Sequence, residues 1–184
     1  GATHPPSPPG QMMPSPWYAL ILLAAMTLWT TTASAHPHVW VTARSELVYD
    51  EKAEITAVRH DWTFDEAYST YATQGLDTDG DGKLSAAELA DLAKINVESL
   101  SDFGYFTKGK ANGKALAFAT PTDYSLAFDK GLLTLKFTLP VKTPLPANRM
   151  LTLEIYDGTY FVSFVMADGD DAVIATGAPK GCTT

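Results

Sequence analysis

The chain has 184 residues, 46% hydrophobic and 11% aromatic, which suits one domain with an ordinary packed core. Acidic residues outnumber basic ones by 21 to 13, and the net charge of -8 argues against a nucleic-acid partner, which requires a basic footprint. The single cysteine, Cys182, excludes a disulfide framework within the chain.

Residues 1–35 are predicted to be a disordered lead followed by a cleavable secretion signal. The run 17–29 is mostly apolar but shorter than the roughly 20 residues that a membrane span needs. Ala33-Ser34-Ala35 fits the small-x-small rule for cleavage, which would leave a periplasmic mature chain of residues 36–184 without a stable membrane span. No Lys or Arg precedes the apolar run, so an uncleaved amphipathic anchor is the alternative.

The first elements of the predicted mature chain are a β-hairpin and a short helix. Residues 38–49 and 53–63 are rich in β-formers and alternate partly in polarity, with a turn at Glu51. That turn would place His60 opposite Thr42 and Trp62 opposite Trp40. Residues 65–75 are the helix candidate, which begins with the acidic pair Asp65 and Glu66.

A longer helix is predicted over residues 86–100. Ser85 can cap its amino end, and Glu88 three positions later completes a capping box. An apolar stripe with a spacing near 3.6 predicts one buried face, formed by Leu89, Leu92, Ala93, Val97 and Leu100.

The remaining chain reads as short strands separated by turn signals. The candidates are 103–107, 114–119, 123–128, 132–139, 149–156, 160–166 and 171–175. Asp157-Gly158 between two apolar runs predicts a tight hairpin. The expected fold class is therefore α+β, a mainly antiparallel β-sandwich or barrel-like domain over 36–184, with a helix–loop–helix insertion at about 65–100.

The loop of this insertion, residues 77–88, reads DTDGDGKLSAAE and matches an EF-hand calcium loop. Calcium prefers six to eight oxygen ligands, which alternating carboxylates can supply around a sharp turn such as the one at Gly82. The predicted ligands are the side chains of Asp77, Asp79 and Asp81, the carbonyl of Lys83, Ser85 directly or through water, and two oxygens of Glu88. The alternative is an acidic surface turn.

The predicted new amino terminus offers a second, transition-metal site. His36 carries an amine and an imidazole, and His38 would lie on the same face of a strand, so both could reach one zinc, nickel or copper ion. Pro37 has no N–H and blocks the square-planar mode that uses the second amide. His60 is a candidate third ligand, although the expected register leaves it about 13 Å from His38.

Five short motifs in order resemble one bacterial family: HPHVWV at 36–41, WTFDE at 62–66, DTDGDGKL at 77–84, YDGTYF at 156–161 and PKGC at 179–182. It is the family known as domain of unknown function 1007, also described as an uncharacterised periplasmic component of an ABC-type transport system. The resemblance implies a periplasmic protein associated with an inner-membrane metal permease, and matches His36, His38 and the calcium loop. It implies no catalytic residues.

The sequence thus predicts a non-enzymatic periplasmic protein that binds calcium and assists zinc, nickel or cobalt handling. One alternative is a structural or interaction module that calcium merely stabilises. Another is a copper-dependent enzyme that uses an amino-terminal His.

Overall fold

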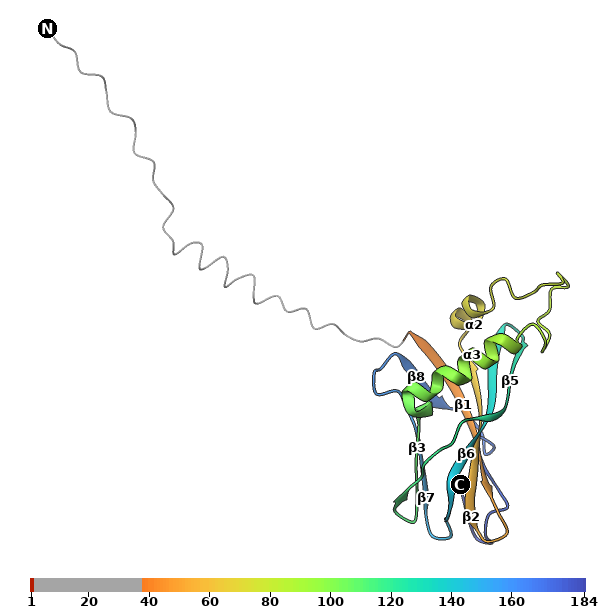
Figure 1. The fold of residues 1–184 in the computed structure, drawn as a ribbon, viewed down its shortest axis with the longest axis vertical. Helices are drawn as coiled ribbons and strands as arrows, with labels where there is room; N and C mark the ends of the chain where they lie inside the picture. Colours follow the sequence, from red (N-terminus) through yellow and green to blue (C-terminus); the bar gives the residue numbers. More distant parts are fainter. Residues whose placement is uncertain (2–37) are drawn as a thin grey trace. The chain divides into compact units, whose positions relative to one another are not determined.

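The computed structural model describes residue 1 and residues 38–184 (Figure 1). The predicted signal, its cleavage site and His36 fall outside the described residues. The larger sheet has the strand order β5-β6-β2-β1-β8, and β9 also pairs with β1. Its strands are β1 (Val39–Tyr49), β2 (Glu54–Phe64), β5 (Thr122–Asp129), β6 (Leu132–Pro146), β8 (Val162–Met166) and β9 (Val173–Thr176).

The smaller sheet has the order β4-β3-β7, from β4 (Lys114–Ala115), β3 (Thr107–Ala111) and β7 (Leu151–Ile155). A β-bridge between Phe118 and Val141 joins the segment after β4 to β6 of the larger sheet. The prediction of a mainly β, α+β fold is confirmed, but the described strands do not close into a barrel. β8 and β9 run parallel to β1, whereas the sequence predicted mainly antiparallel strands.

The β1–β2 hairpin forms as predicted, but its predicted register is wrong. His60 lies opposite Ser45, and Trp62 lies opposite Ala43. The turn is centred beyond Glu51 because Asp50 Oδ1 accepts hydrogen bonds from the N–H groups of Lys52 (2.9 Å) and Glu54 (2.9 Å). Ala53 takes up a left-handed conformation with a φ of 60° to complete this turn.

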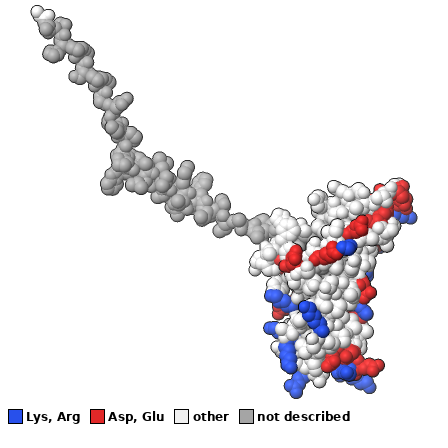
Figure 2. All heavy atoms as spheres, in the orientation of Figure 1, with Lys and Arg blue, Asp and Glu red and all other residues white. Residues whose placement is uncertain are grey.

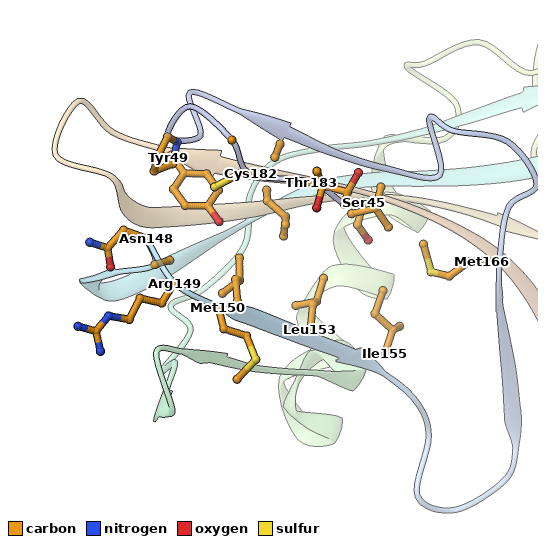
Figure 3. A pocket seen from close by; sticks show the side chains of 18 of the residues that line it. Ser45, Tyr49, Asn148, Arg149, Met150, Leu153, Ile155, Met166, Cys182 and Thr183 are labelled. Atoms are coloured by element: carbon orange, nitrogen blue, oxygen red, sulfur yellow. The ribbon is translucent and has the colours of Figure 1, made fainter.

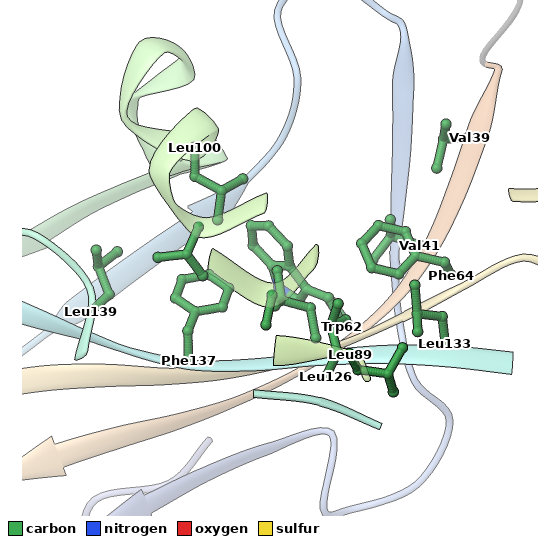
Figure 4. Packing of buried hydrophobic residues seen from close by; sticks show 14 residues of the cluster. Val39, Val41, Trp62, Phe64, Leu89, Leu100, Leu126, Leu133, Phe137 and Leu139 are labelled. Atoms are coloured by element: carbon green, nitrogen blue, oxygen red, sulfur yellow. The ribbon is translucent and has the colours of Figure 1, made fainter. Parts of the chain in front are cut away.

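Two helices, α2 (Glu66–Ala72) and α3 (Ala90–Leu100), lie over one face of the larger sheet (Figure 1). The core between α3 and the sheet includes Trp62, Leu89 and Phe137, each at most 2% exposed (Figure 4). The predicted apolar stripe of α3 is confirmed, since Leu89, Ala93, Val97 and Leu100 are buried and Leu92 packs partly buried beside them.

The predicted strand 103–107 is instead a short 3₁₀ helix, η1 (Ser101–Phe106), followed by β3. Gly104, Tyr105 and Phe106 all have positive φ values, 59°, 58° and 48°, which no extended strand can contain. The chain reverses here so that α3 leads directly into the smaller sheet.

The hairpin predicted at Asp157-Gly158 is also wrong, because β7 pairs with β3 and β8 pairs with β1. The Asp157 carboxylate accepts hydrogen bonds from the N–H groups of Thr159 (2.8 Å), Phe161 (3.1 Å) and Val162 (2.9 Å). Burial raises the pKa of Asp157, and these donors outweigh that effect, so its pKa lies below the ordinary value. The anchored loop carries the chain from one sheet to the other instead of forming a tight turn.

Among residues 38–184, none of the helices has the length and apolar character needed to cross a bilayer.

Candidate functional site

The 77–88 loop connects α2 to α3 and projects from the sheet (Figure 1). α2 is fixed at its start by Asp65, whose carboxylate accepts hydrogen bonds from Trp40 N (2.8 Å) in β1 and from Tyr68 N (2.9 Å). The buried Ser69 holds the same helix to β6, because its hydroxyl accepts a hydrogen bond from Leu133 N at 2.9 Å. The loop therefore starts from a helix tied to two strands.

The far end of the loop is fixed by the predicted capping box. Glu88 N donates to Ser85 Oγ at 3.3 Å, and Ser85 N donates to Glu88 Oε2 at 2.9 Å. The regular part of α3 begins at Ala90, after one turn that includes a hydrogen bond from Leu89 N to Ser85 O at 3.1 Å. Leu76 and Leu84 on either side of the acidic segment pack partly buried against the core.

Three carboxylates meet at the tip of the loop. Asp77, Asp79 and Asp81 each place one oxygen within 4.8 Å of the others, and all three residues are exposed. Asp77 is held from both sides, because Gly80 N donates to its Oδ1 (2.8 Å) and Gly82 N to its Oδ2 (3.0 Å). Both glycines need their left-handed φ values, 73° and 79°, to turn these amides inward.

Glu88 lies at the base of the loop and is not part of this cluster. Its Oε1 accepts from Thr78 N (2.7 Å) and Thr78 Oγ1 (3.0 Å), and its Oε2 accepts from Ser85 N and Ser85 Oγ (2.8 Å). Hydrogen bonds from Ser85 and then Thr78 lower the pKa of Glu88 to about 2. Glu88 is thus a fixed anion that links the second and ninth positions of the loop.

The predicted ligands are therefore brought together in two groups. The three aspartates form one cluster, while Glu88 and Ser85 form a hydrogen-bonded pair, and Lys83 donates its N–H to Asp81 Oδ1 at 2.8 Å. Thr78 was missed by the sequence reading, because the second loop position carries no residue signature of its own. Three clustered carboxylates with a fourth nearby present hard oxygen donors, the type that calcium and magnesium prefer.

The surroundings of the loop are also acidic. Acidic side chains gather over the loop and along α3, whereas most basic side chains lie toward the other end, where a further acidic patch lies among them (Figure 2). Two of the acidic residues on α3 are Asp91 and Glu98, and the latter forms an ion pair with Lys94. This field favours the approach of cations to the loop.

The predicted transition-metal residues are not assembled in the described part of the chain. His38 is exposed just before β1, donates its N–H to Phe161 O (2.8 Å), and has its ring 5.1 Å from the Phe161 ring. His60 is fully buried opposite Ser45, seven residues further along β1, which corresponds to about 23 Å from His38. The structure therefore does not bring His60 to His38.

His60 instead bridges the two sheets. Thr107 Oγ1 donates to Tyr105 O at 2.8 Å, so it must accept from His60 Nε2–H at 3.2 Å. The other ring nitrogen, Nδ1, accepts from the Ser45 hydroxyl at 3.0 Å. Burial lowers the pKa of His60 to about 3, so the ring is neutral and both nitrogens are used within the fold.

The chain has relatives of undescribed function. A family model described as a protein of unknown function, DUF1007, matches residues 21–184. An uncharacterized 15.5 kDa protein in the trpE 3' region of Spirochaeta aurantia is 31% identical over 106 residues, which cover 57% of this chain and 76% of that protein. No solved structure matches the chain. The match over most of the chain shows that it belongs to the DUF1007 family of proteins of unknown function.

Proposed function

We propose that the chain is an exported calcium-binding protein whose 77–88 loop acts as an EF-hand site. The observation that carries the proposal is the convergence of Asp77, Asp79 and Asp81, whose carboxylate oxygens lie within 4.8 Å of one another. Three unit negative charges at this separation repel each other, and a divalent cation relieves that repulsion.

The remaining ligands are close in sequence and supply the rest of a calcium shell. The Lys83 carbonyl and Ser85 would contribute one oxygen each, and Glu88 would contribute two after leaving Thr78 and Ser85. This gives the six to eight oxygens that calcium takes at about 2.3–2.6 Å. The bound ion would replace the hydrogen bonds that now stabilise the Glu88 carboxylate.

A structural role suits the loop better than a switching role. Its flanking residues Leu76, Leu84 and Leu89 pack against the core, so the two helices are held before any ion binds. Sensor proteins open a helix pair on binding, whereas a fixed pair mainly gains stability. Calcium is abundant outside the cytoplasm, so an affinity of about 0.1–1 mM would suffice.

Isothermal titration calorimetry with the mature chain tests calcium binding. We expect one calcium per chain, weaker binding of magnesium, and loss of the signal in the double variant Asp77→Ala, Glu88→Gln. Glu51→Gln is the matched control, because it removes an exposed carboxylate in the β1–β2 turn and should leave the titration unchanged. Equal calcium binding by the double variant would refute the proposal.

We keep a second, transition-metal role as part of the proposal, restricted to His36 and His38. What favours it is the exposed position of His38 at the start of β1, where a free amino terminus at His36 would lie two residues away. His60 is left out, because both its nitrogens are engaged in the buried bridge. A site of this kind could pass zinc, nickel or copper to a metal permease in the inner membrane.

Equilibrium dialysis against zinc, nickel and copper tests this second role on protein that begins at His36. The His36→Ala, His38→Ala double variant should lose the bound metal, while its calcium titration should stay as in the parent. Calcium-dependent stability without any transition-metal binding would support the simpler alternative, a calcium-stabilised structural module.

A further inference from the structure

A cavity of about 630 Å³ lies between β7 of the smaller sheet and strands of the larger sheet (Figure 3). Its walls come from β1, β7, β8 and β9, and its mouth is bordered by residues 179–184. The volume falls in the range of ligand-binding cavities, about 300–1,000 Å³. The walls combine polar and apolar groups, and their apolar residues include Leu151, Leu153, Ile155, Phe164, Met166 and Val173.

The wall formed by β7 is an unpaired strand edge. Tyr156 N donates to Phe106 O (2.9 Å) and Asn112 N donates to Met150 O (2.8 Å), so the even-numbered residues of this stretch face β3. Backbone groups alternate in direction along a strand, which turns the N–H and C=O groups of Leu151, Leu153 and Ile155 away from β3. These three residues also line the cavity, and β7 has no second partner strand among residues 38–184.

The opposite wall of the cavity, formed by β8, also ends in a strand edge without a partner strand in the described part of the chain. Phe161 O accepts from His38 N (2.8 Å) and Ala167 N donates to Ala43 O (2.9 Å), so the odd-numbered residues around β8 face β1. The N–H and C=O groups of Phe164 and Met166 therefore point away from β1, and both residues line the cavity. Two strand edges without a partner strand among the described residues thus border one cavity that has many apolar side chains, and residues 179–184 at its mouth form no strand with either edge.

The charged side chains that line the cavity are basic. Arg149 and Lys180 are the charged side chains that line the cavity, in a chain with a net charge of -8. Unpaired edges accept an added strand through main-chain hydrogen bonds, and pockets beside them select alternate side chains. Lysine and arginine at the mouth select a carboxylate.

We propose that this cavity binds an extended peptide segment of a partner protein by strand addition between β7 and β8. The segment carries apolar side chains at alternate positions and a carboxylate, from an acidic residue or a free carboxyl terminus, beside Arg149 and Lys180. This binding is independent of calcium in the 77–88 loop, because none of the loop residues lines the cavity.

A fluorescent heptapeptide of alternating valine and threonine, with glutamate as its last residue, is the probe. Fluorescence anisotropy with the full mature chain should show saturable binding that weakens about tenfold when lysine replaces the glutamate. Methylation of every second peptide nitrogen, which blocks one edge of the added strand, should abolish binding. The Arg149→Glu variant should bind at least about tenfold more weakly, whereas Lys142→Glu, the same charge change at an exposed site outside the cavity, should bind as the parent does.

Amide hydrogen exchange locates the bound peptide without any substitution. The amides of Leu151, Leu153 and Ile155 should exchange at least about tenfold more slowly with the peptide, while those of Thr152 and Glu154 should stay unchanged.

Three results would overturn the proposal: no saturable peptide binding, binding that tolerates the methylated nitrogens, or occupation of the cavity by palmitate or by a second copy of the chain in place of the peptide.

Discussion

His60 shows how a residue that sequence suggests as a metal ligand can serve the fold instead. Its imidazole lies 5.1 Å from the rings of both Trp62 and Phe137, and hydroxyl groups from the two sheets occupy its nitrogens. Protonation would create a charge that no described carboxylate neutralises. The sequence offered a weak sign of this role, because His60 occupies an inward position in an alternating strand.

We predict that His60 makes the protein less stable in mild acid. Its pKa is about 3 in the fold and about 6.5 in an unfolded chain, so the unfolded chain takes up the proton first as the pH falls. Stability that is fully present above pH 6.5 is then lost progressively towards pH 3. Between pH 7 and pH 5 the loss from this residue is about 2 kcal/mol, measured by urea unfolding.

The His60→Gln variant is the comparison, because glutamine is polar but does not titrate. Its unfolding free energy should change about 2 kcal/mol less between the same two pH values than that of the parent. Should this variant not fold, the ring signals of His60 in NMR spectra of the parent provide the test. Titration of those signals near pH 6.5 in the folded protein would contradict the prediction.

At the scale of elements, Asp65 holds α2 in place in two ways. Asp65 caps the helix and accepts the N–H of Trp40 in β1, which couples the start of the acidic loop region to the sheet. Burial raises the pKa of Asp65, and backbone donors led by Trp40 and Tyr68 outweigh that effect, so its pKa is lowered. The carboxylate therefore stabilises the fold above its ordinary pKa and loses that effect in acid.

We predict that Asp65→Ala lowers the unfolding free energy by about 1–2 kcal/mol at neutral pH, because a cap and a link to β1 are lost together. Chemical denaturation with circular dichroism measures this. Glu66→Ala is the matched control, since that first-turn acid interacts mainly with the helix dipole and should cost only about 0.3–1 kcal/mol. Equal losses in the two variants would show that Asp65 acts only through its charge.

Some structural features of this fold follow from residues close together in the sequence and could be predicted, whereas others depend on distant residues and could not. The apolar stripe of α3 and the Ser85–Glu88 capping box depend on spacings of three and four residues, and both are confirmed. The loop at Asp157 depends on a side chain that binds amides up to five residues away, and a turn signal does not reveal that arrangement. The parallel pairing of β8 and β9 with β1 similarly depends on contacts distant in sequence.

At the scale of the whole molecule, the acidic loop and the core are joined through α3. A cation bound by the folded loop but not by the unfolded chain stabilises the entire domain. With a dissociation constant of about 0.1–1 mM, about 10 mM calcium should add about 1.4–2.7 kcal/mol. Differential scanning calorimetry should show a single transition that rises by about 3–10 °C.

That rise should vanish in the Asp77→Ala, Glu88→Gln variant and persist in Glu51→Gln. A rise of equal size in all three proteins would mean that calcium acts elsewhere on the acidic surface. An equal rise in the transition temperature with sodium at matched ionic strength would mean that calcium acts only by screening the net charge.

The most direct measurement is a crystal structure of residues 36–184 grown in calcium. The account predicts one ion at about 2.3–2.6 Å from oxygens of Asp77, Asp79, Asp81, the Lys83 carbonyl and both oxygens of Glu88. Glu88 would have left Thr78 and Ser85, its partners in the present structure. A loop without an ion, with Glu88 still bound to Thr78 and Ser85, would contradict the account.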